Sequence, residues 1–194
     1  MNYLAHIYLS GDNPLVQLGN FAGDWIKGPM HNLQTKYPIQ MLKGMRMHRF
    51  IDSFTDSNRI VQSSIQKMRP TFGKYSGIVI DVVYDHFLAI NWGKYSEIPL
   101  GQFANKFYSN CLTYYYLLPR KVQLIIPHVL LTDRLKSYEN LRGIKAALTT
   151  MSCQTSLPNR ADKAIEIIKK NYDALNTEFQ EYWEIIYKEC RKFK

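Results

Sequence analysis

The sequence has few cysteines, no long apolar run and comparatively few acidic residues. Cys111, Cys153 and Cys190 are widely separated and form no CxxC pair, so neither a disulfide framework nor a thiolate zinc site is indicated. The apolar runs are interrupted well before the roughly 20 residues that span a bilayer, so no transmembrane helix is expected. The first residues do not resemble a signal peptide, because they lack a basic segment followed by a long apolar stretch. We therefore expect a cytoplasmic protein.

Basic residues outnumber acidic ones, and the excess lies in the first part of the chain. The sequence carries 25 Lys and Arg against 16 Asp and Glu, a formal charge of +9. Residues 158–194 hold eight basic and seven acidic residues, so nearly all of the excess belongs to residues 1–157. Such a field raises the encounter rate of an anionic partner, whether nucleic acid, nucleotide or acidic protein. Charge alone does not choose among these classes.

Strict alternation of apolar and polar residues is absent as well, and the periodicity is helical nearly throughout. The sequence predicts an all-α fold in one compact domain, residues 1–194, without internal repeats or flexible linkers. The expected helices cover residues 14–26, 38–54, 58–68, 74–92, 99–118, 119–131, 137–151 and 160–193. The last helix is expected to dock on the body through apolar residues spaced three and four apart, namely Ile165, Ile168, Tyr172, Leu175, Phe179, Tyr182, Ile186 and Cys190.

One histidine and two aspartates recur at a spacing of four in residues 48–56. At 3.6 residues per turn, His48, Asp52 and Asp56 lie near one helix face, an array suited to metal ligation or acid/base chemistry. Asp56 has the alternative of ending this helix and capping the next one. The phenylalanines among these positions indicate that much of the helix is buried, which disfavours a merely solvated face for His48 and Asp52.

A second polar group interrupts the most apolar predicted helix. Asp81 and Asp85 are one turn apart, and His86 lies about 100° around the helix from Asp85, so all three can border one pocket. Burying two aspartates among Val, Ile, Phe and Leu is costly without a cation or hydrogen-bond partners. A divalent metal would supply that compensation, and a buried salt-bridge network is the alternative.

Two further residues complete the candidate set. His6 is either a ligand or a core histidine, and Asp24 follows small residues that allow close backbone approach. Histidine and aspartate ligands without thiolates favour Mn²⁺, Mg²⁺, Fe²⁺ or Zn²⁺, and the carboxylates favour the harder ions.

The order of these motifs resembles the bacterial acyl carrier protein phosphodiesterases. The resemblance runs to about residue 160 and rests on GNFAGDWIKG, MHRFIDSFTD, Arg69, DVVYDHFL and then Leu135, Tyr138, Gly143, Leu148 and Met151. It implies a divergent, all-α branch of the HD-domain metal phosphohydrolases. It also implies hydrolysis of holo-acyl carrier protein to the apo form and 4′-phosphopantetheine, with Mn²⁺ favoured. The order of Asp85 and His86 reverses the usual HD doublet, which weakens the transfer of ligands from other HD enzymes.

The resemblance and the helical arrays together assign roles to these residues. The expected metal ligands are His48, Asp52, Asp81 and Asp85, completed by Asp24 and His6. His86 is expected to act as a further ligand or as the proton donor to the leaving serine oxygen. Arg49 and Arg69, with Lys27 as a further candidate, are expected to bind the phosphate, because guanidinium groups match its oxygens.

The partner implied by the resemblance is a small acidic carrier protein drawn to the basic body, and neither nucleic acid nor membrane is expected to bind. One alternative is an HD-type hydrolase of nucleotides or small phosphoesters that uses the same cluster. The other is a basic helical nucleic-acid-binding module, although no predicted helix carries a dense stripe of Lys and Arg.

Overall fold

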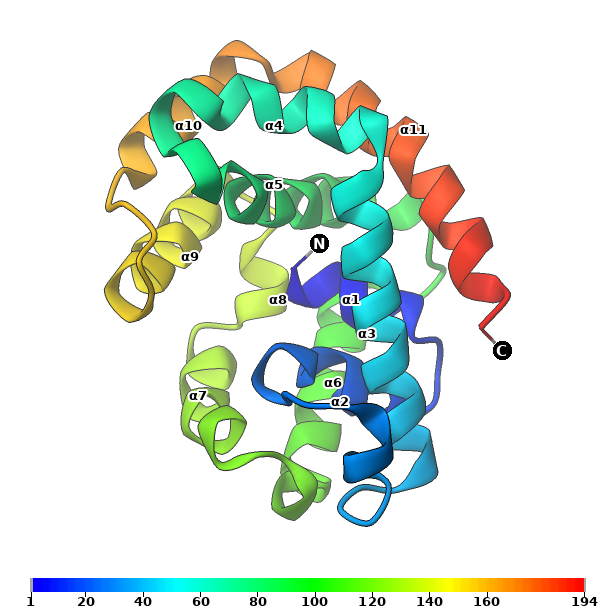
Figure 1. The fold of residues 1–194 in the computed structure, drawn as a ribbon. Helices are drawn as coiled ribbons and strands as arrows, with labels where there is room; N and C mark the ends of the chain where they lie inside the picture. Colours follow the sequence, from blue (N-terminus) through cyan, green and yellow to red (C-terminus); the bar gives the residue numbers. More distant parts are fainter. Residues whose placement is uncertain (1, 194) are drawn as a thin grey trace.

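The chain folds into helices that pack around one core (Figure 1). The computed structural model describes residues 2–193, and over that range it has helices and no strand, which confirms the all-α prediction. The α-helices are α1 (Tyr3–Leu9), α2 (Pro14–Phe21), α3 (Ile39–Ser57), α4 (Arg59–Phe72), α5 (Ser76–Ile90), α6 (Leu100–Thr113), α7 (Arg120–Leu131), α8 (Arg134–Ser137), α9 (Leu141–Gln154), α10 (Ala161–Lys170) and α11 (Tyr172–Arg191). Short 3₁₀ helices lie between them: η1 (Gly23–Trp25), η2 (Met30–Leu33), η3 (Gly73–Tyr75), η4 (Trp92–Lys94) and η5 (Tyr115–Leu117).

Helix starts follow from local sequence where a polar cap or a proline is available. Pro14 occupies the first position of α2, where its missing N–H costs no helical hydrogen bond. The Asn13 side chain accepts from the N–H of Leu15 at 3.0 Å. Asn58 caps α4 in the same way, through the N–H of Ile60 at 2.9 Å, as the segment 56–58 predicted.

Several helices differ from the sequence prediction; those expected for residues 14–26 and 99–118, for example, end at Phe21 and Thr113. We expected a helix to end before Pro70, but α4 continues to Phe72. Pro70 lies in its last turn, where only one ladder bond is lost, and the continuation buries Phe72. The helix expected for residues 137–151 corresponds to α9, which begins only at Leu141 after the cap Asn140, and the short α8 before it was not predicted. Helix α1 was not predicted at all.

The C-terminal helix predicted for residues 160–193 is two helices that meet at Asn171. This residue leaves the helical conformation, with φ −116° and ψ 22°. The change of direction lets α10 pack on α9 and α4 while α11 packs along α4, α5 and α3 (Figure 1). The predicted docking stripe is confirmed: Ile168, Leu175, Phe179, Tyr182, Ile186 and Cys190 are buried, and Ile165 and Tyr172 are half-buried.

Helix α5 forms the centre of the core. From Val79 to Ala89 every residue is buried except Asp81, which is half-buried. The helix packs against α1, α4, α9 and α11. Burial on several sides explains why its sequence is apolar nearly all round.

Helices α2 and α3 cross in close backbone contact. A Cβ on Gly44 would lie 2.1 Å from the carbonyl oxygen of Val16, and one on Gly19 would lie 2.0 Å from that of Met41. Glycine is required at both positions because any larger residue would separate the helices. Since α1 packs on α2, this contact brings the middle of α3 close to α1.

None of the helices in the described range is both long enough and apolar enough to cross a membrane.

Candidate metal centre

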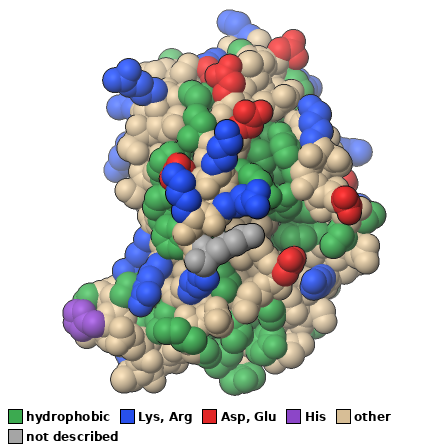
Figure 2. Space-filling model, turned by 90° about the vertical axis from the view of Figure 1, so that its right-hand side faces the viewer, with side chains coloured by type: hydrophobic (Ala, Val, Ile, Leu, Met, Phe, Trp, Pro, Cys, Tyr) green, Lys and Arg blue, Asp and Glu red, His purple; other side chains and the backbone are tan. Residues whose placement is uncertain are grey.

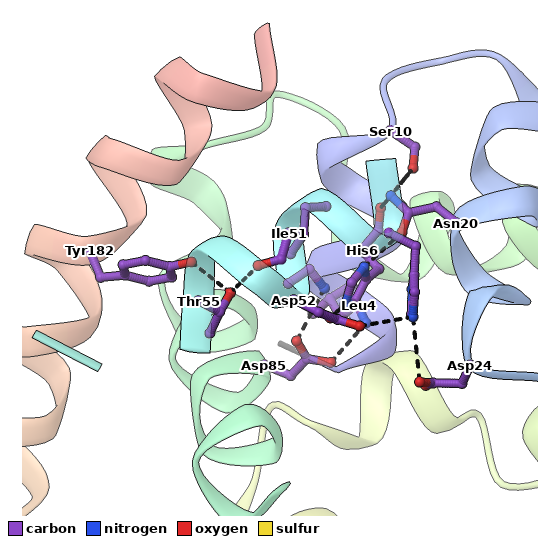
Figure 3. Close-up of polar contacts among 12 residues, drawn as sticks. Leu4, His6, Ser10, Asn20, Asp24, Ile51, Asp52, Thr55, Asp85 and Tyr182 are labelled. Carbon is purple, nitrogen blue, oxygen red and sulfur yellow. Dashed lines mark hydrogen bonds and ion pairs between the residues drawn. The ribbon is translucent and has the colours of Figure 1, made fainter. Parts of the chain in front are cut away.

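Histidines from two helices meet one aspartate at a partly open site (Figure 3). The rings of His6 on α1 and His48 on α3 lie with their centroids 4.4 Å apart. Asp52, one turn after His48, faces both rings: Oδ1 is 3.2 Å from Nε2 of His6, and Oδ2 is 3.0 Å from Nε2 of His48. One donor atom from each residue lies within 4.8 Å of the other two. Three donors at this spacing could hold one metal ion.

Asp24 of η1 adds a second carboxylate. Its Oδ1 lies 3.4 Å from Nε2 of His48, so this nitrogen lies between Asp24 and Asp52. The close approach of η1 depends on Gly23, because a Cβ there would lie 2.2 Å from Cγ of His48. The small residues before Asp24 therefore allow the backbone of η1 to approach His48 closely, as the sequence indicated.

Asn20 holds His6 in one orientation, a role that the sequence analysis missed. Asn20 is fully buried, and its Nδ2 donates to the carbonyl of His6 at 2.9 Å and to Oγ of Ser10 at 2.8 Å. Its Oδ1 is then the acceptor for Nδ1 of His6 at 2.7 Å. A neutral His6 consequently points a bare Nε2 lone pair at Asp52, and two acceptors so close need a cation between them. The sequence feature that could have indicated this role is the position of Asn20, one turn before the candidate ligand Asp24.

The electrostatics of the group favour one bound cation. Burial lowers the pKa of His6 more than the neighbouring carboxylate of Asp52 raises it, so the neutral ring is favoured. Burial also lowers the pKa of His48, but the hydrogen bonds to Asp24 and Asp52 outweigh it and raise this pKa to about 9. Burial raises the pKa of both aspartates, but the hydrogen bond to His48 and the positive charges of the two histidines together outweigh it, so both pKa values are lowered. The group thus pairs two ionised carboxylates with a proton on His48, which a divalent cation could replace.

The site opens on a pocket of about 320 Å³ lined by Gly23, Asp24, Ile26, Lys27, Gly28, His48, Arg49 and Asp52. Nη2 of Arg49 donates to the carbonyl of Gly28 at 2.7 Å, which holds the guanidinium at the rim. Two of the three expected phosphate-binding residues, Arg49 and Lys27, therefore line this pocket. Arg69 lies on α4 and is outside the pocket lining, as far as the described residues show.

Asp85, expected as a ligand, contacts the backbone of α1. Its Oδ2 accepts from the N–H of Leu4 at 2.8 Å and its Oδ1 from that of Ala5 at 3.1 Å (Figure 3). Burial raises the pKa of Asp85 to about 7, although these two hydrogen bonds oppose the shift. Within the described part of the chain, neither Asp85 nor Asp81 belongs to the three-donor group, so their ligand roles stay predictions.

His86 is held by other contacts. Its Nδ1 lies 2.7 Å from the carbonyl oxygen of Tyr138 and its Nε2 lies 2.8 Å from the hydroxyl of Tyr172. The carbonyl can only accept, so Nδ1 donates and Nε2 accepts from Tyr172. Burial lowers the pKa of His86, which agrees with a neutral ring. The catalytic role expected for His86 stays a prediction, with both nitrogens engaged in these two contacts.

The fold and the site define a class of protein: an all-helical chain with a candidate divalent-metal centre beside a pocket that presents cationic side chains. This arrangement suits hydrolysis of a phosphate ester. The comparison with protein families agrees, because the model for acyl carrier protein phosphodiesterase matches residues 1–186. The chain belongs to the acyl carrier protein phosphodiesterase family.

Individual relatives match over nearly the whole chain. The acyl carrier protein phosphodiesterase of Photorhabdus laumondii is 27% identical over 186 residues, which cover 94% of this chain and 92% of that protein. The protein of the same name from Yersinia pestis is 26% identical over 192 residues, 98% of each chain. One from Klebsiella pneumoniae is 36% identical over 107 residues, 54% of this chain and 53% of the relative. No solved structure matches the chain.

Proposed function

We propose that this protein hydrolyses the phosphodiester of holo-acyl carrier protein, releasing 4′-phosphopantetheine and the apo protein. Water adds its oxygen to phosphorus, the bond from phosphorus to the serine oxygen breaks, and a proton goes to that oxygen. The observation that carries the proposal is the group of His6, His48 and Asp52 beside a pocket with Arg49 at its rim. Family membership over residues 1–186 supports the choice of substrate.

His6, His48 and Asp52, with Asp24 next to them, would hold the divalent cation. The donor set fits such an ion because His6 directs a bare nitrogen at a carboxylate and because His48 lies between two carboxylates. Imidazole and carboxylate ligands without thiolate are compatible with Mn²⁺, our preferred ion, and with Mg²⁺, Fe²⁺ or Zn²⁺. When bound, the cation would lower the pKa of a water molecule and offset charge on the phosphate.

Arg49 and Lys27 would bind the phosphate. Arg49 uses Nη2 for the Gly28 carbonyl, which leaves its other N–H groups for two phosphate oxygens. Lys27 is exposed at the same rim and adds a positive charge. The developing negative charge at phosphorus would then meet cationic groups already in position.

Mass spectrometry of holo-acyl carrier protein tests the proposal. Incubation with the protein and Mn²⁺ should remove the phosphopantetheine mass, and a chelator should prevent this. Asp52→Asn should abolish turnover and metal binding together, because Asp52 is the carboxylate that both histidines contact. Asp173→Asn, an exposed carboxylate on α11, is the control and should act as wild type. Full turnover in chelator-treated, metal-free protein would contradict the metal mechanism.

A further inference from the structure

A small cavity lies between the start of α1 and the helices α7, α8 and α9, which are grouped on the left of the molecule in Figure 1. Its volume is about 40 Å³. One water molecule needs roughly 10–15 Å³ of such space, so the cavity has room for about three groups of that size. It shares no lining residue with the pocket of the metal centre, and no Asp or Glu of the described chain lines it. The cavity is therefore a separate site without a negative charge in its wall.

Arg134 brings a positive charge to this cavity. The residue is only 5% exposed, and it forms no ion pair with the described residues. Its side chain donates only through Nη2, to Nε2 of His128 at 3.1 Å and to Oγ1 of Thr150 at 3.5 Å. The preceding Asp133, whose left-handed conformation turns the chain into α8, instead accepts from the hydroxyl of Tyr108 at 3.0 Å. A buried cation without a counter-ion costs free energy.

Cations on the molecular surface differ from Arg134 in this respect. On the face shown in Figure 2, Lys and Arg side chains project into solvent, with Asp and Glu side chains among them. Water solvates such groups, so none of them requires a bound anion. Nε and Nη1 of Arg134, in contrast, have no partner among the described residues inside the protein. A buried guanidinium with free N–H groups favours an oxyanion, because its planar fork matches pairs of oxygen atoms.

Two tyrosine hydroxyls add hydrogen-bond donors at the same cavity. Tyr138 is fully buried, and its hydroxyl accepts from Nδ2 of Asn2 at 3.2 Å. The O–H of Tyr138 has no acceptor among the described residues, and neither has that of Tyr3, which also lines the cavity. Burial raises the pKa of Tyr3 to about 12 and that of Tyr138 well above its usual value, so both hydroxyls keep their protons. The cavity thus combines a positive charge and donors without an anionic acceptor, which is unusual for buried polar groups.

We propose that this cavity binds a small oxyanion, the carboxylate or phosphate group of a low-molecular-weight ligand, through Arg134 and the hydroxyl of Tyr138. Apolar side chains that also line the cavity, such as Ile125, Val129 and Met151, provide contact for an organic part of the ligand. The ligand joins α8 to the start of α1. Because it binds only the folded chain, its binding stabilises the fold.

Thermal unfolding and calorimetry of the full-length protein test the proposal. The probes are sodium acetate and sodium phosphate, and sodium chloride at equal ionic strength is the reference. At least one oxyanion should bind saturably and raise the melting temperature above that in chloride. Arg134→Met should weaken its affinity roughly tenfold or more, because hydrogen bonds to a charged group are lost. Tyr138→Phe, which removes a single oxygen atom, should weaken it several-fold and keeps the test decisive if the Arg134 variant does not fold. Arg142→Met, at an exposed position on α9 outside the cavity, is the control and should keep the wild-type affinity.

The two probes also separate the sources of the oxyanion. Binding of acetate alone identifies a carboxylate ligand and binding of phosphate alone a phosphate ligand, and either result supports the proposal. Melting temperatures that are equal in chloride and in both oxyanions would overturn it, because the cavity would then hold water only. Oxyanion binding that survives in the Arg134 and Tyr138 variants but is lost in Arg49→Gln would assign the anion to the metal centre and overturn the proposal as well.

Discussion

The three buried histidines differ in what surrounds their ring nitrogens. His86 has partners on both nitrogens, a carbonyl and a tyrosine hydroxyl. His6 is fixed through Nδ1 by Asn20, and Nδ1 of His48 is buried without a hydrogen-bond partner among the described residues. In both histidines of the site, Nε2 faces a carboxylate oxygen of Asp52, so a metal ion could bind to the nitrogen and the oxygen together.

Metal binding should release about one proton near neutral pH. The pKa of His48 is about 9, so this ring is protonated there and must lose its proton to bind a metal ion. His6, whose pKa is lowered, contributes none. The apparent affinity for Mn²⁺ should rise up to about tenfold per pH unit below pH 9 and level off above it. Calorimetry in two buffers of different ionisation enthalpy measures the proton directly.

The matched variant for this prediction is Asp24→Asn. It removes one of the two charged hydrogen bonds that raise the pKa of His48, so fewer protons should be released. Metal uptake by the wild type without proton release would show that His48 is not the ligand.

Gly23→Ala should displace His48. The new methyl group would lie 2.2 Å from Cγ of the ring, so η1 or the ring must move. We expect a loss of stability of about 1–3 kcal/mol, with Mn²⁺ affinity reduced at the same time. Denaturant unfolding and metal titration measure the two effects. Gly93→Ala is the control, because its Cβ would meet nothing within 4 Å. Wild-type metal affinity in the Gly23 variant would remove His48 from the proposed centre.

At the scale of elements, α1 depends on its surroundings. It has seven residues, and Asn2 before it makes no capping hydrogen bond through its side chain. An isolated helix of this length is not stable in water. Asp85 on α5 supplies the acceptors that its first turn lacks, so α5 positions the helix that carries His6.

Asp85→Asn should loosen α1. The amide can accept one of the two backbone hydrogen bonds but turns an N–H towards the other donor. We expect a loss of about 1–3 kcal/mol in unfolding free energy, accompanied by weaker metal binding through His6. Asn140→Ala removes the exposed cap of α9 and is the control, with a loss of about 1 kcal/mol and unchanged metal affinity. A fully stable Asp85→Asn protein that binds no metal would support the ligand role predicted from the sequence.

At the scale of the whole molecule, the net charge of +9 is unevenly distributed. The C-terminal helices are nearly balanced, and their ion pairs include Lys163 with Glu166 and Lys192 with Glu189. Exposed pairs of this kind contribute little to stability. Among the described residues the ion pairs of lysine all lie outside residues 25–51, so the five basic residues of that stretch contribute positive charge near the site.

The hydrolysis of carrier protein should depend steeply on salt. The Debye length falls from about 10 Å at 0.1 M to about 3 Å at 1 M, which screens attraction between exposed charges. We expect kcat/KM on holo-acyl carrier protein to fall over this range while kcat at saturation changes much less. A small diester, which contacts only the pocket, should show a shallower slope in the same stopped assays. Equal slopes for both substrates would argue against electrostatic docking.

Local periodicity and caps determined the helical class, the boundaries at Asn13 and Asn58, and the pairing of His48 with Asp52 on one face. These features depend on residues within one or two turns, so one sequence is sufficient to predict them. The resemblance to the family was also readable from the order of the motifs, and the family comparison confirms it.

Only the tertiary structure decided which polar residues meet. It brought His6 to His48 through the close contact of α2 with α3, directed Asp85 to the backbone of α1, and engaged His86 with Tyr138 and Tyr172. Packing also divided the C-terminal segment at Asn171. Each of these outcomes depends on contacts between residues far apart in the chain, whose free energies are set by the whole core rather than by the local pattern.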